Sequence, residues 1–324
     1  MHEGQLTLSE QQVATLVMRQ FPHWASLSVR ALPSSGTVSS LFRLGEELLL
    51  RFPLESADPE AKRVELEAEV AAARRLLDLS RPRAGAGLHK PTVQTPEPLA
   101  LGEPGEGYPL PWSVYRWIPG RVAVNSEAAD SVACAIGLAE FVAQLRSLDT
   151  EGRSFAGSGR GGVLQGQDQV VAHYSALGWS LPRREQMIDV ARLLELWGIL
   201  RQARRPASAS DAWTHGDLMP GNLLLDPEGS GRLAAVIDIC TLAVADPAVD
   251  LMPAWNLFGA TARTAYREAL AVNGQEVSDD EWERGQAWAF AQAVGCLWYY
   301  RRSNPLMSEI AERTLLELLT EKRL

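Results

Sequence analysis

Apolar residues at helical spacing open the chain, and alternating runs follow them. A capping box of Ser9 and Gln12 precedes apolar positions at three- and four-residue intervals up to Phe21, which predicts a short helix. Apolar runs at 27–32, 38–44 and 47–52 are separated by the turn formers of 33–37 and 45–46. This order predicts an antiparallel meander.

The sequence pattern changes from mixed strand and helix to mainly helix near Pro119 and Gly120. Before this point, Asp58 and Pro59 start a helix that extends to about Leu79, and two further strands are expected. These strands are 98–102 and 112–117. After it, helical patterns dominate, at 126–148, 184–204, 261–271, 279–302 and 305–319. We therefore expect an α+β protein, with an N-terminal part (1–118) of antiparallel sheet and one main helix, and a mostly helical C-terminal part (119–324).

Charge and cysteine content narrow the function classes. The 324 residues carry 31 basic and 40 acidic side chains, a net charge of -9, so nothing suggests a nucleic-acid partner. The acidic balance favours cationic small molecules. Three widely spaced cysteines form no metal motif and fit a reducing cytoplasm. The apolar stretch 287–300 is too short to span a bilayer, so no membrane partner is expected, and the oligomeric state stays open.

A polar cluster within an apolar setting carries the candidate chemistry. Residues 214–226 contain Asp217 and Asn222, and Asp238 follows a second apolar run. The runs 223–225 and 233–237 are expected to pair as a hairpin, which would bring the three side chains to one end of it. Two carboxylates and an amide there suit a magnesium-phosphate site. The alternative is that Asp217 and Asn222 only form turns, as Asp and Asn often do.

The order of these motifs resembles that of the aminoglycoside phosphotransferase family. The resemblance is carried by the runs His-Gly-Asp (215–217), Gly-Asn (221–222), Ile-Asp (237–238) and Asp-Pro-Ala-Val-Asp-Leu (246–251). Residues 36–44 are similar to the nucleotide-loop strand of that family, and 111–120 to its interlobe hinge. The resemblance implies a two-lobed, protein-kinase-like fold.

The resemblance also implies a role for each residue of the catalytic loop. Asp217 would orient or deprotonate the acceptor hydroxyl, and Asn222 and Asp238 would hold Mg²⁺ on the phosphates of ATP or GTP. His215 would fix the loop. Asp250 would form hydrogen bonds back to the loop without touching substrate.

The implied nucleotide site lies in the N-terminal part. Arg51 takes the place of the family's phosphate-contacting lysine or arginine, and Glu69 is the expected partner of Arg51, with Glu65 and Glu67 as alternatives. Gly36 and Thr37 belong to the nucleotide loop. The adenine would bond to the backbone of the hinge residues Arg116, Trp117 and Ile118.

Two segments need separate interpretation. After Asp238, the glycines that the family places are replaced by Cys240, Ala243 and Ala245, and an acid by Thr241, so a differently shaped loop is expected. Residues 157–162 satisfy the pattern Gly-x-Gly-x-x-Gly, but the polar residues before them do not predict a strand. We therefore expect a flexible loop or a lid over the substrate, not a dinucleotide site.

The resemblance implies an O-phosphotransferase that moves the γ-phosphate of ATP or GTP to a hydroxyl of an aminoglycoside or related antibiotic, an activity of antibiotic resistance. Acidic residues around the start of the helix at 279–302, with Asp246 and Asp250, favour a cationic acceptor. The alternatives are a kinase of another hydroxylated metabolite or natural product, and a nucleotide-binding regulatory pseudokinase.

Overall fold

The computed structural model describes residues 6–32, 39–54, 57–80, 93–124, 129–157, 160–180 and 188–322. The chain forms two compact units. The first comprises Met1–Gly120 together with Ala235–Cys240, and the second comprises Arg121–Ala234 and Thr241–Leu324. The short segment belongs to the first unit partly because the N–H of Val236 donates to the carbonyl of Gln94 at 3.0 Å.

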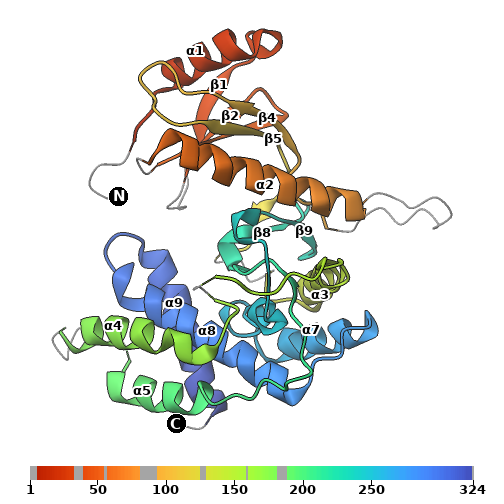
Figure 1. Ribbon diagram of the computed structural model, residues 1–324, viewed down its shortest axis with the longest axis vertical. Coiled ribbons are helices and arrows are strands. Elements are labelled where there is room, and N and C mark those ends of the chain that lie inside the picture. Colours follow the sequence, from red (N-terminus) through yellow and green to blue (C-terminus); the bar gives the residue numbers. More distant parts are fainter. Residues whose placement is uncertain are drawn as a thin grey trace. The chain divides into compact units, whose positions relative to one another are not determined.

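A five-stranded antiparallel sheet forms the centre of the first unit, with strand order β1-β2-β3-β5-β4 (Figure 1). Its strands are β1 (Val29–Leu32), β2 (Ser39–Leu44), β3 (Leu48–Pro53), β4 (Pro98–Gly102) and β5 (Trp112–Arg116). The predicted meander and the two later strands are all present. In the register of the sheet, Arg51 of β3 lies opposite Leu41 on one side and Ser113 on the other.

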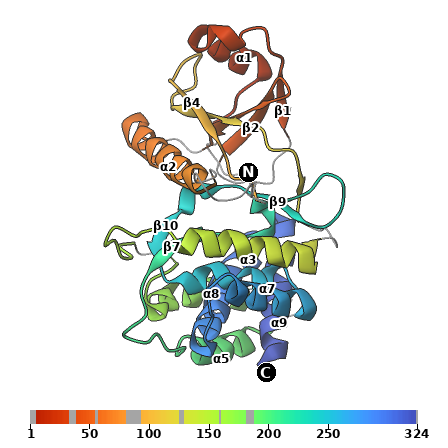
Figure 2. The ribbon, with the colours of Figure 1, turned by 90° about the vertical axis from the view of Figure 1, so that its right-hand side faces the viewer.

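Strand alternation gives this sheet two different faces. Leu50 and Trp112 point to the face that packs against α1 (Glu10–Gln20), whose predicted capping box is formed. Arg51 and Tyr115 point to the other face, where α2 (Pro59–Ser80) lies. Figures 1 and 2 show the two helices on different sides of the strands. The apolar core of this unit therefore lies under α1, and the polar site faces α2.

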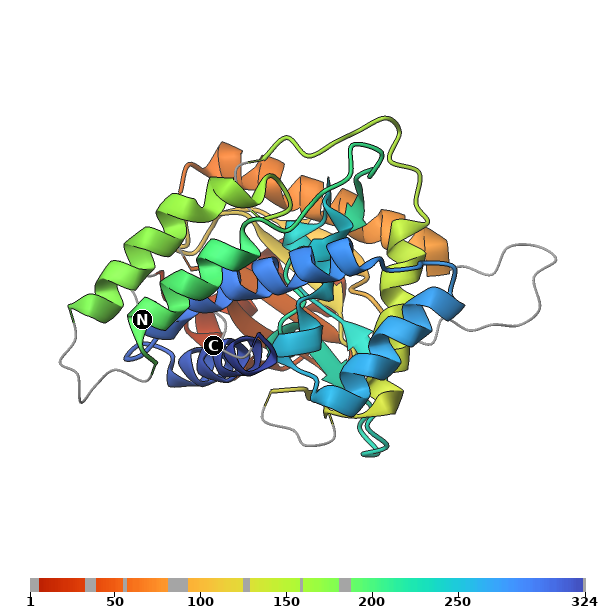
Figure 3. The ribbon, with the colours of Figure 1, turned by 90° about the horizontal axis from the view of Figure 1, so that it is seen from below.

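The second unit is mostly helical, which confirms the α+β prediction. Its helices are α3 (Val132–Arg146), α4 (Asp168–Trp179), α5 (Val190–Leu200), α6 (Pro253–Asn256), α7 (Ala260–Val272), α8 (Asp279–Tyr299) and α9 (Pro305–Glu321). α8 packs against α4, α5 and α9, and Figure 3 shows the green helices beside the blue one. Helix α4 was not expected from the sequence pattern. Among the described residues, no helix is long and apolar enough to cross a membrane.

Short strands and single helical turns precede or follow the polar residues of the predicted site in the sequence. β6 (Arg121–Val122), β8 (Leu223–Leu225) and β9 (Leu233–Val236) form a small sheet, and β8 and β9 are neighbours in it, as the hairpin prediction required. β7 (Ala212–Thr214) pairs with β10 (Ala243–Ala245). Single 3-10 turns span Pro220–Asn222, Ile239–Thr241 and Pro247–Leu251.

Candidate functional site

In the first unit, Arg51 is the centre of a buried polar cluster. One guanidinium nitrogen donates to Glu69 Oε1, and Nη2 donates to Asp238 Oδ1 at 3.2 Å. The side chains of Arg51 and Glu69 are 15% and 8% exposed, so the pair is largely shielded from water. The hydroxyl of Tyr115 also donates to Glu69 Oε1, at 3.0 Å. The cluster therefore joins β3, β5, α2 and the segment after β9.

The carboxylates keep Arg51 charged in this setting. Burial by itself lowers the pKa of the guanidinium, but Glu69 and Asp238 outweigh it, and the pKa of Arg51 is raised. Burial and the Glu69 carboxylate together raise the pKa of Tyr115, which stays a neutral donor. A fixed guanidinium of this kind is suited to binding phosphate oxygens.

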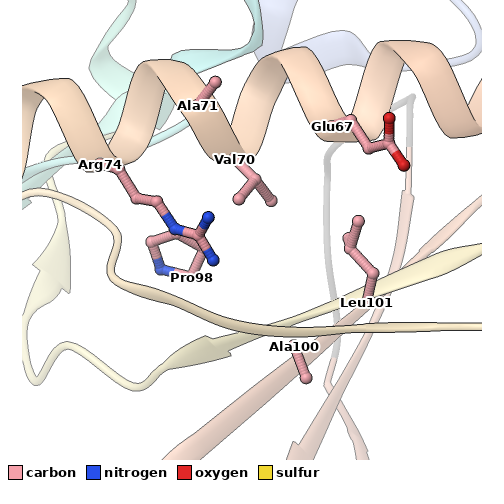
Figure 4. Close-up of a pocket in the computed structure, with 7 residues that line it drawn as sticks. All are labelled: Glu67, Val70, Ala71, Arg74, Pro98, Ala100 and Leu101. Atoms are coloured by element: carbon pink, nitrogen blue, oxygen red, sulfur yellow. The ribbon is translucent and has the colours of Figure 1, made fainter.

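The three glutamates considered as partners of Arg51 have different surroundings. Glu69 contacts Arg51, whereas Glu65 forms an ion pair with Lys62 and is 63% exposed. Glu67 lines a cavity of about 340 Å³ between α2 and β4, with Arg74 two helical turns further on (Figure 4). The other residues that line this cavity are Val70, Ala71, Pro98, Ala100 and Leu101. Arg51 and Glu69 do not line it.

Asp238 has an unusual backbone conformation. Its φ of +63° lies in the left-handed region, which costs a non-glycine residue about 1 kcal/mol or more. Two donors reach the same carboxylate oxygen, Oδ1: Arg51 Nη2 at 3.2 Å and the Cys240 thiol at 3.3 Å. The surroundings therefore hold the side chain of Asp238.

The loop predicted to be catalytic follows β7 in the second unit and is anchored by Asp250. This side chain is fully buried, and its two oxygens accept the backbone N–H groups of His215 at 2.8 Å and Gly216 at 2.9 Å. Burial raises the pKa of the Asp250 carboxyl, and His215 and the two N–H groups oppose that rise. Thr241 donates to the carbonyl of His215 at 2.6 Å. Asp250 thus makes the contact expected of it, and Thr241 adds a second anchor.

Three side chains donate to the carboxylate of Asp217. Oδ1 accepts Arg160 Nη2 at 2.8 Å and Gln292 Nε2 at 2.7 Å, and Oδ2 accepts Asn222 Nδ2 at 3.2 Å. Asn222 Nδ2 also donates to the Asp217 carbonyl at 2.8 Å. Because only the amide nitrogen of Asn222 can donate, its carbonyl oxygen is left for another partner. Arg160 and Gln292 were not among the residues expected from the sequence.

The backbone of the segment after Asp238 does not require the glycines that the family places there. Within 238–246, all of it described, Asp238 alone has a positive φ, so Cys240 and Ala243 adopt ordinary conformations. Ala245 lies in β10, where a Cβ built on Gly161 would come within 2.5 Å of the Ala245 Cβ. The methyl group of Ala245 therefore occupies space that Gly161 leaves free.

The predicted hinge has two of its backbone donors in use. The N–H of Arg116 donates to the carbonyl of Glu97 at 2.9 Å, and that of Trp117 to the carbonyl of Glu47 at 2.7 Å. A nucleotide base at the predicted hinge would therefore have to bond to the N–H of Ile118 or to backbone carbonyls of the hinge. The guanidinium of Arg43 lies over the ring of Trp117, 3.7 Å from its centroid. Gly36 and Thr37 lie outside the described residues.

In the described part of the chain, no group of three or more His, Cys, Asp or Glu side chains could hold a metal ion. Taken one at a time, Asn222 of the second unit offers an amide oxygen and Asp238 of the first unit a carboxylate oxygen. Each is a hard donor of the kind that Mg²⁺ accepts, and Mg²⁺ commonly takes one or two protein ligands and completes its shell with phosphates and water.

Four of the acidic residues expected to attract a cationic acceptor form ion pairs within the protein. Glu281 contacts Arg146 at 3.0 Å, and Asp246 contacts Arg284 at 2.8 Å. Asp279 and Glu283 pair with Arg267 and Lys322. Their charge is balanced within the protein and gives no support to a cationic acceptor.

Comparison with solved structures shows a shared fold. An aminoglycoside 2'-phosphotransferase solved in its GDP complex is 20% identical, with a TM-score of 0.66 over 97% of this chain and 100% of that one. An APH(2″) enzyme solved with GDP and kanamycin is 19% identical, with a TM-score of 0.64 over 96% and 98%. A macrolide 2'-phosphotransferase from Brachybacterium faecium, solved as the apoenzyme, is 20% identical, with a TM-score of 0.60 over 94% and 97%. The kinase-like fold is thereby confirmed.

Comparison at the sequence level gives the family. No curated protein sequence matches the chain. The sequence model of the phosphotransferase enzyme family matches residues 29–288, which include the Arg51 cluster and the loop of Asp217. The chain therefore belongs to the phosphotransferase enzyme family.

Proposed function

We propose that this protein transfers the γ-phosphoryl group of ATP or GTP to a hydroxyl of a small molecule. One observation carries the proposal. In a member of the phosphotransferase enzyme family, three side chains hold the Asp217 carboxylate, and the buried Asp250 anchors the loop in which Asp217 lies. Transfer chemistry of this kind depends on positioning and on charge stabilisation rather than on covalent catalysis.

Each proposed site residue has a defined role. Asp217 orients the acceptor hydroxyl through Oδ2 and accepts its proton late in the transfer. Arg51, held by Glu69, contacts the phosphates of the nucleotide. Asn222 and Asp238 would hold Mg²⁺, which would supply positive charge to the phosphates of the nucleotide. His215 and Asp250 keep the loop in shape.

For the acceptor, an aminoglycoside or a related antibiotic is our first proposal. Its support is that structures of the same fold include an APH(2″) enzyme holding kanamycin and a macrolide 2'-phosphotransferase. A specific observation favours a second candidate, a neutral hydroxylated metabolite or natural product. The guanidinium of Arg160 lies beside Asp217, and Asp279, Glu281 and Glu283 of α8 form ion pairs, so much of the nearby negative charge is already balanced.

Two measurements test the proposed function. In the first, thermal shifts with ATP or GTP are compared with and without Mg²⁺, in the wild type and in Asp238→Ala. We expect stabilisation that needs Mg²⁺ and is lost in the variant. In the second, γ-labelled nucleotide is incubated with a panel of aminoglycosides, macrolides, amino sugars and choline.

Labelled phosphate on one acceptor supports the proposal and identifies the substrate class. Nucleotide binding with neither transfer to the panel nor nucleotide hydrolysis would instead indicate a regulatory pseudokinase. Absence of any magnesium-dependent nucleotide binding would refute the proposal as a whole.

A further inference from the structure

Arg160, a described residue of the glycine-rich pattern 157–162, contacts the predicted catalytic loop. Arg160 Nη2 donates to Asp217 Oδ1 at 2.8 Å, and its Nε and Nη2 both approach the carbonyl of Gly216 at 3.3 Å. The guanidinium thus contacts both the side chain of Asp217 and the backbone just before it. The side chains of Arg160 and Asp217 are 30% and 28% exposed, so the contact lies at the surface of the loop and stays open to a ligand.

Glycine packing fixes the backbone next to Arg160. Gly161 has a φ of +104°, and a Cβ there would lie 2.5 Å from the Cβ of Ala245, so only glycine allows this approach to β10. The carbonyl of Gly161 accepts the N–H of Asp246 at 2.9 Å. Asp246 is itself held by Arg284 in a pair that is almost fully buried. The backbone next to Arg160 is therefore held in place within the second unit.

A second donor reaches the same oxygen from another element. Gln292 of α8 is 7% exposed, and its Nε2 donates to Asp217 Oδ1 at 2.7 Å. Two donors from separate elements on one oxygen restrict rotation of the carboxylate, because a turn about its Cβ–Cγ bond would break both bonds. Oδ2, with its longer 3.2 Å contact to Asn222, is left as the oxygen for the acceptor hydroxyl.

We propose that Arg160 is a positioning residue of the phosphoryl transfer, which together with Gln292 holds Oδ1 of Asp217 and thereby presents Oδ2 to the acceptor. The proposal rests on the function proposed above for Asp217. It also explains one glycine of the pattern 157–162, because Gly161 brings the chain close enough to β10 for Arg160 to reach the loop of Asp217. Neither Arg160 nor Gln292 touches the reacting atoms, and both act through Asp217.

The test compares Arg160→Ala, Arg160→Lys and the control Arg153→Ala. Arg153 lies in the same loop region, is 49% exposed and pairs with Glu151, so its loss removes the same charge without touching Asp217. Steady-state kinetics are measured with the acceptor that the panel identifies. Loss of one charge-assisted hydrogen bond predicts a kcat for Arg160→Ala that is about ten- to a hundredfold lower, with the KM for magnesium-ATP nearly unchanged.

Two readouts separate positioning from a merely structural role. Millimolar guanidinium should restore part of the kcat of Arg160→Ala and leave Arg153→Ala unaffected, and Arg160→Lys should keep an intermediate kcat. Gln292→Ala, which removes the other donor to Oδ1, should show the same loss in kcat without a change in the KM for nucleotide. It serves as the independent variant if Arg160→Ala folds poorly.

An active wild type whose Arg160→Ala and Gln292→Ala variants keep or raise kcat would overturn this proposal alone. A kcat loss that guanidinium does not restore, accompanied by an equal loss in Arg153→Ala, would overturn it as well. A wild type that binds nucleotide but transfers phosphate to no acceptor is a different result, because it refutes the proposed function on which the inference rests.

Discussion

Replacing Glu69 by alanine should destabilise the first unit strongly, because it removes the main partner of a buried arginine. In the folded protein, the Arg51 side chain is 15% exposed and that of Glu69 is 8% exposed. Tyr115 is buried as well, and its hydroxyl would lose the acceptor that it has in Glu69 Oε1. The variant would leave a guanidinium and a hydroxyl without their principal acceptor in a shielded place.

The size of the loss follows from these contacts. Breaking a buried ion pair by removing one partner costs about 3–5 kcal/mol. Asp238 remains 3.2 Å from Arg51 and compensates part of the charge, so we expect the lower end, about 3 kcal/mol of the free energy of unfolding. Glu65→Ala is the matched control, because Glu65 lies one turn earlier on α2, is 63% exposed and pairs with Lys62. It should cost about 0–1 kcal/mol.

The assay is urea unfolding followed by tryptophan fluorescence, with Trp112 in the core of the first unit as one of the reporters. A third variant, Arg51→Met combined with Glu69→Leu, should recover much of the stability because it buries no charge. The same variant should lose affinity for magnesium-ATP in a titration, since the phosphate contact is gone. If Glu69→Ala costs no more than Glu65→Ala, the pair is not buried as described and the reasoning is wrong.

Three further variants or reactions test other contacts of the site. Asp250→Ala should lower the free energy of unfolding by about 2–4 kcal/mol in urea titrations, because two buried N–H groups lose their acceptor; a neutral effect would contradict its anchoring role. Gly161→Ala should lower kcat as Arg160→Ala does, because the new Cβ would lie 2.5 Å from Ala245; wild-type kinetics would show that the close approach is dispensable. Cys240 as a residue is exposed, but the protein atoms around its thiol and the Asp238 carboxylate raise its pKa to about 12, so iodoacetamide at pH 8 should label it at least about tenfold more slowly than glutathione, as peptide mass spectrometry can check. Asp238→Asn should speed that labelling, and equal rates would argue against the thiol–carboxylate contact.

The parts of the fold that the sequence predicts well are those where local pattern and packing agree. The capping box of Ser9 and Gln12 marks the start of α1, and the alternation of β3 places Arg51 on the face opposite Leu50. Preference for Glu69 over Glu65 and Glu67 depends on the family resemblance, and the structure shows the contact. Periodicity alone does not settle which of three glutamates on one helix turns toward the sheet.

Helix α4 escapes prediction because its buried stripe is made of small residues. Val171, Ser175 and Gly178 face the core, and a Cβ built on Gly178 would lie 2.5 Å from the ring of Trp298. Large apolar residues at helical spacing are the usual signal of a buried helix face. Here the neighbouring helix supplies the large side chain, Trp298. The sequence of α4 therefore lacks the large apolar residues that would mark a buried helix face.

The contacts of Asp217 could not be inferred from the sequence because they are tertiary. Arg160 lies 57 residues before it and Gln292 75 residues after it along the chain. The glycine-rich pattern 157–162 is visible in the sequence, but the reason for Gly161 is the space that Ala245 takes on another strand. The signal that the sequence offered for the first of these contacts was a single arginine, Arg160, among the glycines of this pattern.

The measurement that tests the central claim most directly is a single-turnover comparison of the wild type with Asp217→Asn. Labelled nucleotide and the acceptor identified in the panel are mixed with excess enzyme, and formation of the phosphoester is followed by rapid quench. We predict a transfer rate about 10²- to 10⁴-fold lower in the variant, with the dissociation constant for the magnesium nucleotide nearly unchanged. A variant that transfers phosphate at the wild-type rate would contradict the role of Asp217 and the mechanism built on it.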